Sequence, residues 1–93
     1  MPLTVTLPAA LQPFAAGART LRLDASCATA ADALDEVRLR WPAVHDRVMT
    51  EQGEVREHVN IFVGDESIRL AGGLATPVGD GDTIMIVAAV SGG

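Results

Sequence analysis

The sequence predicts an α+β domain of two layers, in which a mixed sheet of four to five strands packs on one helix. Segments near both ends of the chain alternate apolar and polar residues with period two, which is typical of half-buried strands. A segment between them has an apolar stripe with a period of about 3.6 residues, which is typical of a helix. The length of 93 residues, with 48% hydrophobic and 20% charged residues, suits one globular core.

The first 23 residues predict a hairpin. Residues 3–7 and 19–23 each alternate apolar and polar side chains, so we expect two strands with one apolar face each. Pro8 ends the first strand because proline lacks the amide donor that a sheet requires. Residues 9–17 are predicted to be a loop, in which Leu11 and Phe14 pack against the core.

A helix is predicted from Thr29 to Arg40. Thr29 is a suitable N-cap, and Asp32 three residues later completes an approximate capping box. Pro42 ends the helix because the residue before a proline is disfavoured in the helical region. The segment 43–57 is polar and predicts one short helical turn followed by a loop. The apolar stripe of the predicted helix consists of Ala30, Leu34, Val37 and Trp41.

Three further strands are predicted over residues 58–63, 67–70 and 83–89. The last segment is the richest in isoleucine and valine, so we place it at the centre of the sheet, beside the first strand. The connection between them contains a helix, which makes the two strands parallel. This arrangement is the β-grasp, the topology of ubiquitin. By strand parity, Ile84 and Ile86 point into the core, whereas Phe62, Met85 and Val87 point outward.

Composition argues against several classes of function. The net charge of −5 disfavours nucleic-acid binding, which requires a basic surface. We expect no membrane span, because no apolar run approaches the roughly 20 residues that one needs. A single cysteine, Cys27, and two isolated histidines, His45 and His58, predict neither a disulfide nor a metal site. No nucleophile and base can be paired, so we expect no catalysis. A cytoplasmic protein, monomeric when alone, is the expectation.

The chain ends on Val90-Ser91-Gly92-Gly93, directly after the last predicted strand. By spacing alone, this end fits a frayed terminus as well as a reactive tail. Together with Asp80-Gly81-Asp82, Val59-Asn60-Ile61-Phe62-Val63 and Ala71-Gly72-Gly73-Leu74-Ala75-Thr76, however, it resembles the ubiquitin-like sulfur carriers of the MoaD/ThiS family. The resemblance covers nearly the whole chain, is strongest from His58 to Gly93, and is greatest to the actinobacterial CysO branch.

The resemblance implies a β-grasp domain over residues 1–89 and a flexible tail over 90–93. An E1-like, MoeB/ThiF-like partner would use ATP and magnesium to adenylate the carboxylate of Gly93, and sulfur would then replace AMP to leave a thiocarboxylate. Val90, Ser91 and Gly92 would thread into the partner's site. The sulfur acceptor would be a synthase of the cysteine synthase-like, molybdopterin synthase large subunit-like or thiazole synthase-like class. The carrier binds no cofactor or metal itself.

Two alternatives stay open at the level of the sequence. Phe62, Met85 and Val87 suit a docking face for these partners, but a loop that covers them would explain their apolar character equally well. The same terminus also serves ubiquitin-like modifiers, which are conjugated through Gly93 to lysines of target proteins. The chain has seven arginines and no lysine, so it could be attached to other proteins but not through side-chain amines to itself.

Overall fold

The computed structural model describes residues 2–24 and 26–88. The strands in this part of the chain are β1 (Leu3–Thr6), β2 (Thr20–Leu23), β3 (Val59–Val63), β4 (Glu66–Ser67) and β5 (Thr83–Ala88). The helices are α1 (Ala30–Arg40) and α2 (Pro42–Val48), together with the 3-10 helices η1 (Ala9–Ala15), η2 (Ile68–Leu70) and η3 (Gly73–Ala75). No helix among these described residues is both long and apolar enough to span a bilayer.

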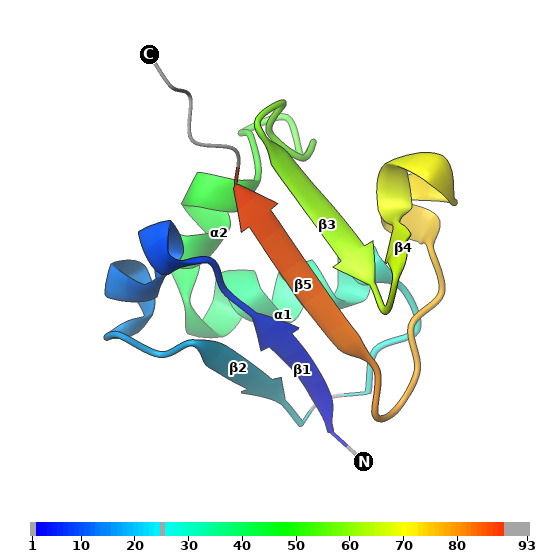
Figure 1. Ribbon diagram of the computed structural model, residues 1–93, viewed down its shortest axis with the longest axis horizontal. Coiled ribbons are helices and arrows are strands. Elements are labelled where there is room, and N and C mark those ends of the chain that lie inside the picture. The colour runs from blue at the N-terminus through cyan, green and yellow to red at the C-terminus, as the bar shows by residue number, and fades with distance from the viewer. Residues whose placement is uncertain (1, 25, 89–93) are drawn as a thin grey trace.

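The strands form one five-stranded mixed sheet in the order β2-β1-β5-β3-β4 (Figure 1). β5 lies at the centre, parallel to β1 and antiparallel to β3. β1 and β2 form the predicted hairpin, with Val5 opposite Leu21. The β-grasp topology predicted from the sequence is therefore confirmed. Both α-helices cover one face of the sheet and leave the other face open (Figure 1).

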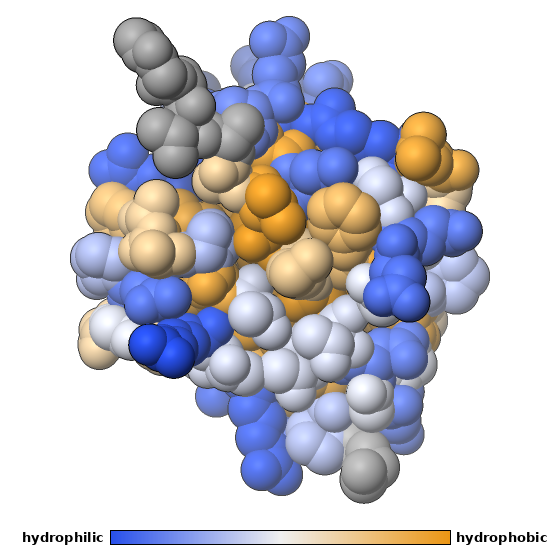
Figure 2. Space-filling view, viewed as in Figure 1, coloured by the Kyte–Doolittle hydropathy of each residue, from blue (hydrophilic) through white to orange (hydrophobic). Residues whose placement is uncertain are grey.

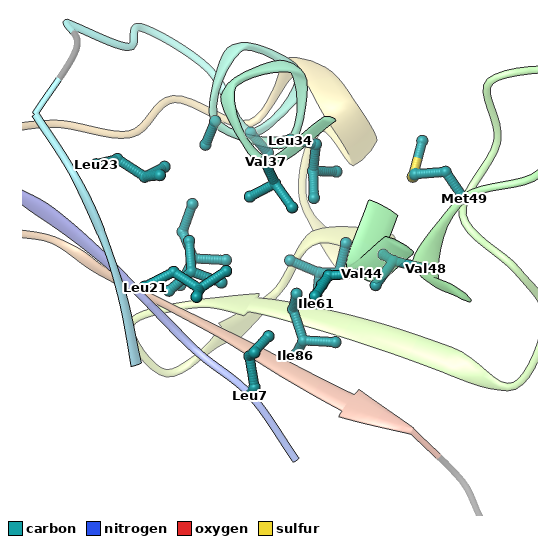
Figure 3. Packing of buried hydrophobic residues seen from close by; sticks show 14 of the residues in the cluster. Leu7, Leu21, Leu23, Leu34, Val37, Val44, Val48, Met49, Ile61 and Ile86 are labelled. Atoms are coloured by element: carbon teal, nitrogen blue, oxygen red, sulfur yellow. The ribbon is translucent and has the colours of Figure 1, made fainter. Parts of the chain in front are cut away.

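The core lies between the sheet and the two helices. Inward residues of alternate strand positions, such as Val5, Ile61 and Ile86, are at most 1% exposed. Ile61 and Ile86 point toward Val44 and Val48 of α2 (Figure 3). Burying a side chain of this size contributes roughly 1.5–3 kcal/mol each, so this layer is the main source of stability.

Helix α1 begins where the sequence predicted. Thr29 Oγ1 accepts a hydrogen bond from the Asp32 amide at 3.3 Å, and Asp32 Oδ2 accepts one from the Thr29 amide at 3.2 Å. The predicted capping box is thus formed. Of the predicted stripe, Ala30, Leu34 and Val37 are buried, and Trp41 is half-buried against the core.

Replacing Thr29 with alanine is expected to lower the free energy of unfolding by about 1 kcal/mol, because the Asp32 amide at the start of the helix loses the Thr29 hydroxyl that accepts its hydrogen bond. Urea denaturation would measure this. Asp35→Ala is the matched control on the same helix, since it removes only an exposed ion pair with Arg38 that contributes about 0.5 kcal/mol or less. Equal losses in the two variants would contradict the capping role of Thr29.

Three segments differ from the sequence-based prediction. Residues 9–15, predicted as loop, form η1, which buries Leu11 and Ala15. The prediction that Phe14 also packs against the core is wrong, because Phe14 is 36% exposed and its ring lies under the Arg47 guanidinium. The single helical turn predicted after Pro42 is the longer helix α2, so two α-helices rather than one pack on the sheet. The predicted strand 67–70 is wrong beyond its first residue, because β4 stops at Ser67 and η2 follows. Ser67 Oγ accepts a hydrogen bond from the Arg69 amide at 3.3 Å, which turns the chain into η2.

Candidate functional site

The strand that precedes the predicted tail is held from both sides. In β5, Met85 pairs with Thr6 of β1 and with Phe62 of β3, and Ala88 pairs with Val59 of β3. The position at which the chain leaves β5 is therefore fixed by the sheet. The tail residues predicted from the sequence, Val90, Ser91, Gly92 and Gly93, lie outside the described residues.

The open face of the sheet has an apolar centre. Phe62 lies opposite Met85 in the β3–β5 register, and Val87 lies opposite Asn60. Met85 and Val87 are 40% and 39% exposed, and Phe62 is half-buried. Figure 2 shows apolar groups gathered over the middle of this face. The outward direction predicted for Phe62, Met85 and Val87 is confirmed, and no described segment buries Met85 or Val87.

The polar neighbour of this apolar centre is fixed in place. Asn60 Oδ1 accepts hydrogen bonds from the Ser67 hydroxyl at 2.8 Å and from the Ile61 amide at 2.9 Å. Arg69 Nη2 donates to the carbonyl of Val59 at 2.6 Å and holds the start of β3. The face that carries Phe62, Met85 and Val87 is thus preorganised, which reduces the entropy lost when a partner binds.

Groups suited to catalysis are not assembled in the described part of the chain. It contains no cluster of three or more His, Cys, Asp or Glu side chains that could hold a metal ion. Burial raises the pKa of the Cys27 thiol, and the nearby carboxylates of Glu36 and Asp32 raise it further, so the thiolate is disfavoured. Burial lowers the pKa of His45, although the Asp46 carboxylate opposes the shift.

Sequence reasoning missed a depression beside the end of β5. Its lining includes Phe14 of η1, Arg47 of α2, Arg56, His58 and Ala88. These residues come from segments far apart in the sequence, and none of the segments carries a recognisable motif. The one available signal was the presence of His45, Arg47, Arg56 and His58 in one polar segment, where they alternate with four carboxylates.

The ThiS family model matches residues 5–93. The chain belongs to the ThiS family. It is 35% identical to the sulfur carrier protein CysO of Mycobacterium tuberculosis over an alignment that covers 100% of both chains. The small archaeal modifier protein 1 of Haloferax volcanii is 39% identical over 79 residues, which cover 84% of this chain and 86% of the modifier.

A solved structure agrees with this membership. A chain in the crystal structure of the Amycolatopsis orientalis BexX/CysO complex superposes with a TM-score of 0.85 and 34% identity, covering 98% of this chain and 99% of that chain. The relatives of this ThiS-family member are small ubiquitin-like carriers rather than enzymes, in agreement with the expectation from sequence that the chain is not itself a catalyst.

Proposed function

We propose that this chain carries sulfur as a thiocarboxylate on Gly93 and donates it to a biosynthetic acceptor. The observation that carries the proposal is the end-to-end alignment with the sulfur carrier protein CysO, since it covers 100% of both chains. The family match likewise runs to residue 93. The chemistry requires a carboxylate on a narrow tail mounted on a stable domain, and β5 supplies such a mount.

The proposed reaction has two steps. A carboxylate oxygen of Gly93 first attacks the α-phosphorus of ATP, which an E1-like partner holds with magnesium, and pyrophosphate leaves. Hydrosulfide, or the persulfide of a partner, then attacks the acyl carbon, and AMP leaves with the original carboxylate oxygen. A persulfide route also needs a thiol to reduce the resulting disulfide. The carrier contributes the acyl group alone and acts as a cosubstrate in the cytoplasm, where ATP is available.

The glycines explain why such a tail can reach an enclosed site. Gly92 and Gly93 have no Cβ, and glycine can adopt backbone conformations that other residues avoid. Val90 and Ser91 would span the distance between the body and the nucleotide. Threading the tail costs conformational entropy, so contacts from the folded domain must offset that loss.

The apolar centre of the open face is the proposed source of these contacts. Phe62, Met85 and Val87 lie on strands next to the point where the chain leaves the sheet. Methionine and aromatic side chains are enriched at interfaces, and methionine adapts to partners of different shape. One face could therefore dock first an activating enzyme and later an acceptor.

Three classes of acceptor fit the carrier. They are a cysteine synthase-like enzyme, the large subunit of a molybdopterin synthase-like complex, and a thiazole synthase-like enzyme that makes a cofactor or a natural product such as a thiosugar. The relative from Amycolatopsis orientalis was solved as a BexX/CysO complex. The likeness to CysO favours the first class.

The test is an intact-mass measurement. We expect incubation with ATP, magnesium, sulfide and each E1-like enzyme of the host to replace one oxygen by sulfur within the C-terminal peptide. Omitting ATP is the control, because adenylation must precede sulfur transfer. The proposal fails if the mass stays unchanged with every activating enzyme, or if sulfur is found on Cys27 instead.

A second function is supported by the likeness to an archaeal modifier protein. The small archaeal modifier protein 1 of Haloferax volcanii also has a crystal structure that superposes with a TM-score of 0.83 and covers 100% of both chains. We therefore keep conjugation through Gly93 to lysines of other proteins as the alternative. Conjugates of higher mass in host lysate, dependent on ATP and on Gly93, would favour this function over sulfur transfer alone.

A further inference from the structure

A depression of about 640 Å³ lies where η1, α2 and the end of β5 meet. Its floor is apolar, with buried Leu11 and partly exposed Phe14. Three of its lining residues, Ala10, Ala43 and Ala88, have small side chains. The complete lining is Ala10, Leu11, Phe14, Ala43, Asp46, Arg47, Arg56, His58 and Ala88.

The charge of this depression is opposite to that of the whole molecule. Arg47 and Arg56 both line it, against the single carboxylate of Asp46 among the described lining residues. The chain as a whole has a net charge of −5. Within the described residues, the ion pairs that form involve Arg22 and Arg38, and neither lining arginine is paired with a carboxylate.

Both arginines are held in place by contacts that leave their charge unneutralised. The Arg47 guanidinium stacks over the Phe14 ring, 4.4 Å from its centroid. The Arg56 Nε and Nη2 atoms donate to the backbone carbonyl of Asp46 at 3.0 and 2.9 Å. Because the side chains are already ordered, binding an anion costs less entropy than it would at a free surface arginine.

The depression also adjoins the reactive tail. Ala88 forms part of its wall. Gly93 follows five residues later, and a chain of that length spans at most about 18 Å. The site of a protein that takes up Gly93 therefore lies within about 18 Å of this wall, close enough for the same protein to contact the depression.

We propose that the depression binds an acidic segment of the partner that encloses the tail, with carboxylates on Arg47 and Arg56 and an apolar side chain on Phe14. This inference rests on the proposed function. Carboxylate–guanidinium pairs are geometrically specific as well as strong, so they fix the orientation of the partner relative to the tail. The open face of the sheet supplies contact area, whereas the contact at the depression determines the direction in which the tail enters the partner.

The test compares charge reversals at two exposed arginines. Arg47→Glu is expected to raise the KM of the activating enzyme for the carrier at least tenfold while kcat stays within twofold. Arg22→Glu is the matched control, because it makes the same change of net charge on β2, level with the start of β5. It should change KM less than twofold. Arg47→Gln should give an intermediate KM, and circular dichroism verifies that all three variants fold.

The outcomes separate the two proposals. Equal effects of Arg47→Glu and Arg22→Glu, or no effect of either, would overturn the docking site while leaving the carrier function intact. If the wild type is never activated, the carrier function fails, and a peptide titration decides the docking site instead. An acetylated Glu-Glu-Phe-Glu-Glu peptide should then shift the NMR signals of Ala10, Ala43 and Ala88, whereas its Gln-Gln-Phe-Gln-Gln counterpart should not. Shifts spread over the whole molecule, or no shifts, would overturn the site.

Discussion

A variant that ends at Ser91, without Gly92 and Gly93, is expected to lose thiocarboxylate loading by more than about a hundredfold. Two residues shorten the extended tail by roughly 7 Å. A misplacement of about 1 Å can already cost a hundredfold in rate, because the reacting atoms must meet in a narrow geometry. The carboxylate of the shortened tail would stop short of the nucleotide, although every contact of the domain with its partner remains.

The same variant is expected to keep its melting temperature within roughly 3 °C of the wild type, since changes outside the core alter stability by about 0.5 kcal/mol or less. The buried hydrophobic residues of the described chain run from Leu3 to Ile86, before the tail begins. Ser91→Gly is the control, because it preserves the length of the tail and should load within a few-fold of the wild type. A large fall in melting temperature would show instead that the tail packs on the domain.

Much of the fold could be predicted because its determinants are local. Alternation identified β1, β2, β3 and β5, and the Thr29–Asp32 capping box identified the start of α1. The central place of β5 followed from its isoleucine and valine content, since a strand with neighbours on both sides is the most buried. The inward side chains Ile84 and Ile86 are each 1% exposed, as parity predicts.

The remaining elements depend on contacts that are distant in the sequence. β4 stops at Ser67 because its hydroxyl donates to Asn60 of β3, while its oxygen accepts from the Arg69 amide. η1 contains Pro13 and no strong periodicity, yet it forms because Leu11 and Ala15 reach the core. Neither the hydrogen-bond partner of Ser67 nor the position of the core surface can be read from local pattern.

The candidate site likewise has one part that the local sequence predicts and another that depends on contacts between distant segments. The parity of Phe62 in β3 and of Met85 and Val87 in β5 is a local feature of each strand, and the terminal glycines follow β5 in the sequence, so the sequence alone predicts them. The depression beside Ala88 requires η1, α2, the segment before β3 and the end of β5 to converge. Arg47 and Arg56 belong to a segment that the sequence predicts to be polar and solvated, whereas the structure orders them through the ring of Phe14 and the carbonyl of Asp46.

Ile86→Ala is expected to lower the free energy of unfolding by about 3 kcal/mol, which corresponds to a fall in melting temperature of roughly 15 °C for a domain of this size. Ile86 is 1% exposed, lies opposite Ile61 in the sheet, and points toward α2 (Figure 3). Truncation would leave a cavity that the sheet and α2 together cannot close. Calorimetry or urea denaturation of the purified protein would measure the loss.

Substitution of the adjacent residue, Met85→Ala, is expected to leave the stability nearly unchanged and to weaken binding to the activating enzyme. Met85 is 40% exposed on the open face, so its truncation should cost less than about 1 kcal/mol of stability. It should weaken binding to the activating enzyme about tenfold, the effect of losing an apolar anchor of an interface. Titration calorimetry would measure the affinity of both variants for the activating enzyme, and so distinguish the role of the open face of β5 from that of its buried face. If Met85→Ala destabilised the domain as strongly as Ile86→Ala, or left binding unchanged, the open face would not be the docking surface.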